Sequence, residues 1–327
     1  MSTSLWITWE KQRRNRSMAR ELSIPIHEII SNQSRLIRYA SLLLSTTKLL
    51  INDKPTVLFV QNPSVVLATF SVITKFFFNI RSVVVDAHNG GIFPLDGRSK
   101  ILNLISLLII KRADLTIVTN ENLKTYVENR GGRAVVIPDP LPEFGQNVDE
   151  LYLTDNFKSK TIITYVCTWA SDEPFLEVIK AAAMLPENVY IYITGRPPQT
   201  LNYQIPENVM LTGYIDDKEY VKLLSSSALL MVLTSRDNCL NCGAYEAVSL
   251  CKPMILAKTA VIQSYFNKGA IYTGLSSEEI YTAINEAVGD LLNLSLEVVA
   301  LKKDLINLWD GYSAPLRDFL DDIKTVS

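Results

Sequence analysis

The sequence of 327 residues predicts an α/β protein with two Rossmann-like doubly wound domains that face each other across a cleft. Short apolar runs of strand length alternate with longer helical patterns in both halves of the chain. Residues 138–147, rich in proline, separate the two blocks. The predicted domains are residues 1–147 and 148–327, and the last helix could return to the first domain.

In the first domain, the run LWITW at residues 5–9 is typical of a first strand. The polar run EKQRRNR at residues 10–16 predicts the turn that follows it, and a helix is expected from residue 17 to 22. Further strands are expected at residues 57–60, 83–85, 115–118 and 134–137, and further helices at 35–51, 64–78, 100–111 and 121–129.

In the second domain, the apolar run at residues 229–233 predicts a buried strand. A polar loop leads from it to Gly243, which is expected to open a helix at 244–250. That helix ends at Lys252-Pro253, because the residue before a proline is disfavoured in the α region. Glu246 is therefore expected in its first turn. The other strands are expected at residues 161–166, 189–193, 209–211, 254–257 and 270–272, and the other helices at 174–184, 218–224 and 277–288, with two helical patterns in the tail, one through 305 and one at 316–323.

Charge and hydropathy exclude several classes of protein. Residues 1–150 hold 18 Lys/Arg against 13 Asp/Glu, a net +5, and residues 151–327 hold 14 against 21, a net −7. A net +5 is too weak to indicate nucleic-acid binding, but it suits an anionic surface or a phosphorylated acceptor. No apolar run reaches the roughly 18 residues of a spanning helix, so we expect a protein that lies on a membrane rather than crosses it.

Four cysteines occur without a signal-peptide pattern, so reduced thiols are expected. Cys239 and Cys242 form a C-x-x-C motif, but a zinc site needs two more ligands, and the only histidines, His27 and His88, are distant in sequence. We expect no metal. The glycine patterns of dinucleotide-binding and P-loop proteins are absent, as is a D-x-D run that could hold a divalent cation.

Ligands of open α/β sheets bind at the carboxyl ends of the strands. In the second domain this places Glu246 and the loop before it at the predicted site, where a carboxylate can accept hydrogen bonds from sugar hydroxyls. The competing interpretation is that Glu246 only complements the helix dipole. Gly195 and Arg196 follow another strand and are candidate diphosphate contacts.

In the first domain, Asp86 and His88 follow a strand and are candidates for taking a proton from an attacking hydroxyl. Glu10 is a weaker candidate of the same kind. Structural roles, a turn cap for Asp86 and packing for His88, are the alternative. Arg13 and Arg14 could clamp a phosphate, or simply form a charged surface turn.

Five segments in order resemble the GT-B glycosyltransferases, and in particular chitobiosyldiphosphodolichol beta-mannosyltransferases and bacterial polysaccharide glycosyltransferases. They are FVQNP (residues 59–63), VVDAHN (84–89), IVTN (117–120), CTWASDEPF (167–175) and ITGRPP (193–198), with YEAVSLCKPMILA (245–257) typical of the wider group. The resemblance covers roughly residues 5 to 320.

This resemblance implies a metal-independent, cofactor-free hexosyltransferase of surface polysaccharide or glycolipid assembly. Its donor would be a UDP- or GDP-linked sugar, its acceptor a polyprenyl-diphosphate-linked sugar, and its place the cytoplasmic face of the cell membrane. For such a reaction we expect Asp86, His88 and Glu10 as catalytic residues, and Arg13, Arg14, Asn89, Gly90 and Gly91 as acceptor-binding ones. The expected donor-binding residues are Gly195, Arg196, Gly213, Tyr214, Ile215, Thr234, Ser235, Asn241, Gly243, Tyr245 and Glu246.

Two departures bear on stereochemistry. Many retaining relatives carry a glutamate eight positions before the helix glutamate, where this chain has Asn238, and a basic residue where it has Thr168-Trp169-Ala170. Inversion is therefore favoured over retention. Two other functions stay open: a non-catalytic nucleotide-sugar-binding or regulatory subunit of a transferase complex, and a nucleotide-sugar 2-epimerase.

Overall fold

The computed structural model describes residues 3–62, 64–144, 160–199 and 203–325. The chain forms two compact units, Met1–Pro140 with Leu308–Ser327, and Leu141–Asn307. The division falls inside the expected linker. Leu141 packs against the core of the second unit, and the Ser249 hydroxyl donates a hydrogen bond to the carbonyl of Pro142, which explains why the second unit begins this early.

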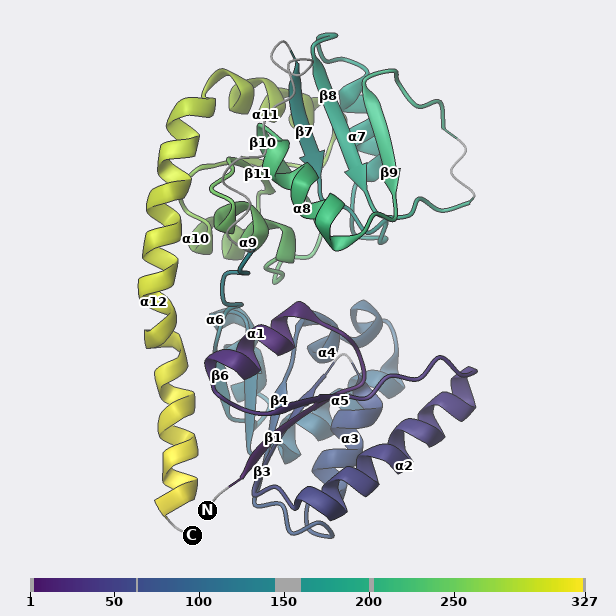
Figure 1. The fold of residues 1–327 in the computed structure, drawn as a ribbon, viewed down its shortest axis with the longest axis vertical. Helices are drawn as coiled ribbons and strands as arrows, with labels where there is room; N and C mark the ends of the chain where they lie inside the picture. Colours follow the sequence, from purple (N-terminus) through teal and green to yellow (C-terminus); the bar gives the residue numbers. More distant parts are fainter. Residues whose placement is uncertain (1–2, 63, 145–159, 200–202, 326–327) are drawn as a thin grey trace. The chain divides into compact units, whose positions relative to one another are not determined.

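The first unit contains a six-stranded, all-parallel sheet with the order β2-β1-β3-β4-β5-β6 (Figure 1). Its central strands are β-branched and apolar runs, as expected for strands covered on both faces. The strands are β1 (Ser4–Thr8), β2 (Ile26–Glu28), β3 (Val57–Gln61), β4 (Ser82–Asp86), β5 (Leu115–Val118) and β6 (Ala134–Val136).

Alternate residues of these strands point to opposite faces of the sheet. Ile7, Val60 and Val85 belong to a core shared with helices α2, α3, α5 and α6, whereas Trp6 and Val84 belong to a core shared with α1 and the end of α12. The helices of this unit are α1 (Arg13–Glu21), α2 (Arg35–Asp53), α3 (Val65–Thr74), α4 (Asn89–Ile92), α5 (Lys100–Arg112) and α6 (Glu121–Glu128), with a 3-10 turn η1 (Pro94–Gly97).

The second unit also contains a six-stranded parallel sheet, ordered β12-β11-β10-β7-β8-β9. Its strands are β7 (Thr161–Tyr165), β8 (Val189–Thr194), β9 (Val209–Gly213), β10 (Leu229–Val232), β11 (Met254–Ala257) and β12 (Ala270–Thr273). Its helices are α7 (Phe175–Ala182), α8 (Asp217–Ser226), α9 (Cys242–Ser249), α10 (Ala260–Tyr265), α11 (Ser277–Gly289) and the first part of α12 (Leu291–Thr325).

The predicted two-domain α/β fold is confirmed, with differences at particular elements. The predicted turn at residues 10–16 is wrong in its second half, because α1 begins at Arg13 and buries Arg14 and Asn15. Strand β2 was not predicted, since it has only three residues and follows a proline. The two helical patterns of the tail are one helix, α12, which continues through Pro315.

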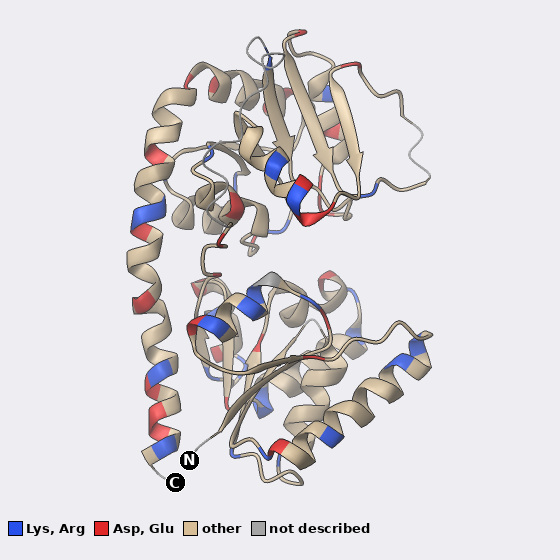
Figure 2. Ribbon diagram, in the orientation of Figure 1, with Lys and Arg blue, Asp and Glu red and all other residues tan. Residues whose placement is uncertain are grey.

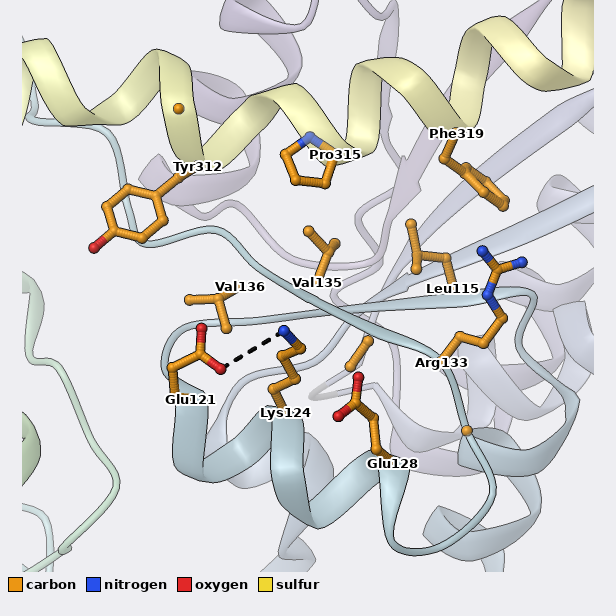
Figure 3. A pocket seen from close by; sticks show the side chains of 13 residues that line it. Leu115, Glu121, Lys124, Glu128, Arg133, Val135, Val136, Tyr312, Pro315 and Phe319 are labelled. Carbon is orange, nitrogen blue, oxygen red and sulfur yellow. Dashed lines mark ion pairs between the residues drawn. The ribbon is translucent and has the colours of Figure 1, made fainter.

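Pro315 has no amide hydrogen, so the carbonyl of Gly311 loses its intrahelical partner. Both residues line a pocket of about 470 Å³ between α6, β6 and α12 (Figure 3). Apolar side chains of β6 and α12 form much of this pocket, and an ion pair between Glu121 and Lys124 lies at its edge. None of the residues predicted to bind a ligand lines it.

We predict that Leu316→Ala destabilises the first unit by about 2–5 kcal/mol, because Leu316 is fully buried in the core between α12 and the sheet. Leu308→Ala, at a half-exposed position of the same helix, is the matched control and should cost less than about 0.5 kcal/mol. Urea unfolding followed by tryptophan fluorescence measures both, in a Trp169→Phe background that leaves Trp6, Trp9 and Trp309 of the first unit as probes. A loss for Leu316→Ala as small as that expected for the control would show that this side chain of α12 does not stabilise the unit.

Candidate functional site

Asp86 ends strand β4 and is held by a buried arginine. The side chain of Asp86 is 1% exposed. Nε of Arg14 lies 3.2 Å from each carboxylate oxygen of Asp86, and Nη2 lies 2.9 Å from Oδ1. The hydrogen bonds fix the carboxylate of Asp86 at the carboxyl edge of the first sheet.

Arg14 is also bound on its other side. Its Nη1 donates to Oδ1 of Asp139, and its Nη2 donates to the carbonyl of Ile137 at 3.0 Å. The guanidinium therefore faces two carboxylates inside the protein, whereas the sequence analysis expected it to face an acceptor phosphate. Asp139 was not identified as a site residue because its Pro-Asp-Pro context indicates a linker; its place directly after the last strand was the available signal.

His88 lies beside this pair. Its Nε2 is 3.7 Å from Oδ2 of Asp86, and its side chain is 27% exposed. Burial raises the pKa of Asp86, but the charges of Arg14 and His88 and the hydrogen bonds from Arg14 outweigh it, so this pKa is below its ordinary 3.8. Burial lowers the pKa of His88 below 6.5, and the charge of Arg14 adds to this, against the opposing charges of Asp86 and Asp139. Asp86 is therefore ionised and His88 neutral at pH 7.

Polar atoms of His88 and of two nearby asparagines are buried without hydrogen bonds. Nε2 of His88, Oδ1 of Asn89 and Oδ1 of Asn62 are buried and have no hydrogen-bond partner among the described residues. Gly91 is required for packing, because a Cβ there would lie 1.5 Å from the carbonyl oxygen of Asn62. Gly90 is exposed, with open space around it. Asn89 and His88 thus present polar groups that can bind a polar ligand.

The other first-domain candidates lie near the end of β1. Glu10 is half-buried, and its Oε2 accepts a hydrogen bond from Nε2 of Gln12 at 3.3 Å. The side chain of Arg13 lies outside what the structure describes. The hydroxyl of Thr8, which ends β1, donates to Oε1 of Gln61 at 2.5 Å and ties the ends of β1 and β3 together.

In the second unit, Glu246 is buried and its Oε2 accepts a hydrogen bond of 2.5 Å from the hydroxyl of Tyr220 on α8. Since α9 begins at Cys242, Glu246 lies in the second turn and not in the first. This weakens the interpretation that Glu246 only complements the helix dipole, because that effect falls off beyond the first turn. Tyr220, which orients this carboxylate, was missed by the sequence analysis.

The loop after β10 is anchored to the loop after β7. The buried hydroxyl of Thr234 donates to Oδ2 of Asp172 at 2.6 Å, and the exposed Ser235 donates its backbone amide to the carbonyl of Asp172 at 2.8 Å. Asp172 also pairs with Arg236 at 3.2 Å. Asn241 is the N-cap residue of α9, and its Oδ1 is buried without a hydrogen-bond partner among the described residues.

Three glycines of the candidate donor site have local structural reasons, one in close packing and two in backbone conformation. Gly243 packs its backbone on the sheet, since a Cβ there would lie 2.9 Å from Cγ1 of Val166. Gly195 and Gly213 have φ of +81° and +65° and pair through an isolated bridge. After them the chain exposes Arg196 and Tyr214, while Ile215 is half-buried.

Tyr245 does not belong to a ligand surface. It is 2% exposed, and its ring packs against Tyr265 and Phe266 in the core. The sequence places it beside Glu246, but consecutive helical residues point about 100° apart, and here one faces the core.

The loop after β7 contains a carboxylate that the sequence analysis did not single out. Oε2 of Glu173 accepts hydrogen bonds from the amides of Thr168 at 2.9 Å and Ala170 at 2.8 Å. Trp169 between them has φ of +62°, and its indole donates to the carbonyl of Thr194 at 2.9 Å. The carboxylate of Glu173 thus accepts hydrogen bonds from backbone amides that could otherwise bind an anion.

Across the described ranges, no group of three or more His, Cys, Asp or Glu side chains has an arrangement that could hold a metal ion. Within the same ranges, no helix is both long and apolar enough to cross a membrane.

Comparisons with known proteins agree with this architecture. The sequence model of the family described as "Glycosyl transferases group 1" matches residues 154–306. No curated protein sequence matches the chain significantly.

Solved structures share the fold over nearly the whole chain. The structure of HepE from Anabaena in complex with UDP and glucose has a TM-score of 0.72 at 14% identity, covering 97% of this chain and 100% of that one. Sucrose-phosphate synthase from Thermosynechococcus elongatus has a TM-score of 0.73 at 12% identity, with 100% of both chains covered. A putative UDP-N-acetylglucosamine 2-epimerase from Listeria monocytogenes has a TM-score of 0.60 at 10% identity, covering 96% and 98%.

The observed architecture agrees with these matches. It has a parallel six-stranded sheet in each of two units and a buried glutamate on the helix after β10. The chain has the GT-B fold, and its residues 154–306 match the sequence model of the group 1 glycosyl transferases.

Proposed function

We propose that the protein transfers a hexose from a nucleotide diphosphate-sugar to a hydroxyl of a lipid-diphosphate-linked sugar, with inversion and without a bound metal. The observation that carries the proposal is the buried carboxylate of Glu246, fixed by Tyr220 in the part of the chain that matches the glycosyl transferase family. UDP bound in the HepE structure supports a UDP-linked donor, and a GDP-linked sugar is the second candidate.

In this proposal the second unit binds the donor. The carboxylate of Glu246 accepts hydrogen bonds from hydroxyls of the ribose or the sugar. Gly213, Tyr214 and Ile215 contact the base. The amides at the start of α9 near Gly243, together with Arg196 and Ser235, bind the diphosphate, because a helix N-terminus favours anions.

The first unit supplies the base and the acceptor site. The acceptor hydroxyl attacks the anomeric carbon, its proton passes to His88, and the bond from the anomeric carbon to the diphosphate oxygen breaks. The ionised Asp86 favours the tautomer of His88 with its proton on Nε2, so that Nδ1 can take the proton of the hydroxyl. Asn89 and the exposed Gly90 contact the acceptor. Arg14 acts by positioning Asp86 and not by clamping a phosphate.

A location at the inner face of the cell membrane and a role in surface polysaccharide or glycolipid assembly follow from the lipid-linked acceptor. They belong to the same proposal.

The first test is thermal unfolding in the presence of UDP, GDP, CMP and their sugar conjugates. A ligand that binds only the folded protein at about 100 times its Kd stabilises it by roughly 3 kcal/mol. We expect a rise in Tm with one nucleotide family, UDP first. No rise with any nucleotide would contradict the proposed donor site. Interconversion of UDP-sugars without an acceptor would instead identify an epimerase.

We predict that Glu246→Gln raises the Kd of the nucleotide-sugar about 10- to 100-fold, because hydrogen bonds to a charged acceptor contribute about 1.5–3 kcal/mol. Isothermal titration calorimetry measures this. Glu286→Gln, at an exposed glutamate of α11, is the matched control and should leave the Kd unchanged. Tyr220→Phe should have a smaller effect in the same direction. Unchanged donor affinity in Glu246→Gln would remove this residue from the donor site.

We predict that His88→Gln lowers kcat about 10²- to 10⁴-fold and leaves the donor Kd unchanged, because it removes the general base. His27→Gln, which changes the other histidine at a half-exposed position, is the control.

The pH dependence follows from the lowered pKa of His88. A base must be neutral to act, so kcat/KM should rise with pH through a pKa below 6.5 and be constant from there to neutral pH. The variant His88→Gln should lose this rise. An acid limb that persists in the variant would assign the titrating group elsewhere.

A further inference from the structure

The first unit exposes its large apolar side chains on one of its two helical layers. Apart from Leu308, every exposed large apolar side chain described in this unit lies between residues 30 and 104. They are carried mainly by α2, α3 and α5, which cover one face of the sheet (Figure 1). The α1 and α12 side of the same sheet shows no comparable exposure in the described residues.

Helix α2 has two apolar sides. Leu42, Thr46 and Leu50 are buried against the sheet. Ile37, Leu44 and Ile51 recur every seven residues and lie on the opposite side of the helix, where Leu44 is 71% exposed. A surface helix of a soluble protein normally carries polar residues on that side, so this second stripe requires an explanation.

The neighbouring helices add to the exposed apolar surface. Phe76 and Phe77 follow Lys75, the C-cap residue of α3, and are 75% and 85% exposed. Ile101 and Leu104 on α5 are also exposed, and α3 and α5 pack together. Adjacent exposed phenylalanines are rarely left in water unless they contact a partner or a membrane.

The same layer is strongly basic. Residues 30–112 contain ten Lys/Arg and three Asp/Glu, and one of the three acids, Asp86, is buried. Arg35, Lys48 and Lys100 are exposed. Lys48 lies four residues after Leu44 and three before Ile51, which places it on the same side of α2. Figure 2 shows the Lys and Arg positions along the helices of this layer. Lysine is depleted at interfaces between proteins, whereas apolar stripes with Lys and Arg are typical of helices at anionic membrane surfaces.

We propose that the outer side of the α2, α3 and α5 layer docks on an anionic lipid bilayer. Leu44, Ile51, Phe76 and Phe77 insert at the level of the headgroups, and the basic side chains contact lipid phosphates. The chain runs from His88 through α4 and η1 into α5, so the proposed acceptor site and the docking face share one segment. The inference deepens the proposed function by naming the surface that contacts the bilayer in which a lipid-linked acceptor lies. It rests on the proposed function only for the reason why the protein would bind a bilayer.

The test is co-sedimentation of the purified full chain with vesicles of phosphatidylcholine, alone or mixed with phosphatidylglycerol. We expect binding to the anionic vesicles that weakens with added salt and little binding to the neutral ones. Lys48→Gln with Lys100→Gln should weaken binding roughly 30-fold, because each cation near such a surface contributes about 1 kcal/mol. Leu44→Ser with Phe77→Ser should weaken it roughly tenfold or more.

Matched controls lie in the second unit. Lys218→Gln with Lys222→Gln changes two exposed lysines of α8, and Leu292→Ser with Leu296→Ser changes two exposed leucines of α12; neither should alter sedimentation. Each variant is checked for an unchanged Tm. Absence of vesicle binding, equal binding to neutral vesicles, or unaltered binding of the Lys48 and Lys100 variant would overturn the inference, and the first result would point to a protein partner instead.

Vesicle binding needs neither donor nor acceptor, so it is independent of the proposed reaction. Transfer to a short-chain, water-soluble diphosphate-linked acceptor measures that reaction without a bilayer. Loss of vesicle binding with this transfer retained supports the docking face. Vesicle binding without any transfer supports docking and counts against the proposed function.

Discussion

The first unit depends on a buried arginine that two carboxylates share. Arg14 bonds to Asp86 at the end of β4 and to Asp139 after β6, so it connects segments that are 72 and 125 positions away in the sequence. Burying these charges costs several kcal/mol per ion, and removing one partner from such a cluster costs about 3–5 kcal/mol. The cluster fixes Asp86 in its ionised form, and that charge in turn sets the environment of His88. The environment of His88 at this edge of the sheet therefore depends on helix α1, whose charged sequence is typical of a turn.

In the second unit, internal hydrogen bonds also fix polar side chains in one orientation, and fewer of the partners are charged. Glu246, Thr234 and Glu173 are each fixed by a hydrogen bond to a neighbouring element or loop: Tyr220 of α8, Asp172, and the amides around Trp169. A polar group held in one orientation loses little entropy when a ligand binds, so such contacts favour specific recognition. The carboxylate of Glu173 accepts hydrogen bonds from amides of the β7 loop, and the proposed function therefore assigns the diphosphate to the start of α9.

Much of the architecture was predictable because strands covered on both faces must be continuously apolar. Runs such as residues 57–60 and 229–233 show this directly, and the strand ends locate Asp86, His88 and Glu246. Strand β2 and the start of α1 were not predictable, since β2 is three residues long and α1 begins with Arg-Arg-Asn-Arg. Tyr245 was misjudged because the sequence shows neighbours along the chain and not the direction in which each side chain points.

The sequence by itself determined the two parallel α/β sheets, the order of their elements and the strand ends that carry polar residues, because these follow from local hydrophobic periodicity and turn residues. Only the tertiary structure decided what those polar residues contact. It paired Arg14 with Asp86 and Asp139 and placed Tyr220 on Glu246. It also left a second apolar stripe of α2 exposed. The reason is physical: partners 26 to 125 positions apart meet through packing of whole elements, and no local pattern encodes that meeting.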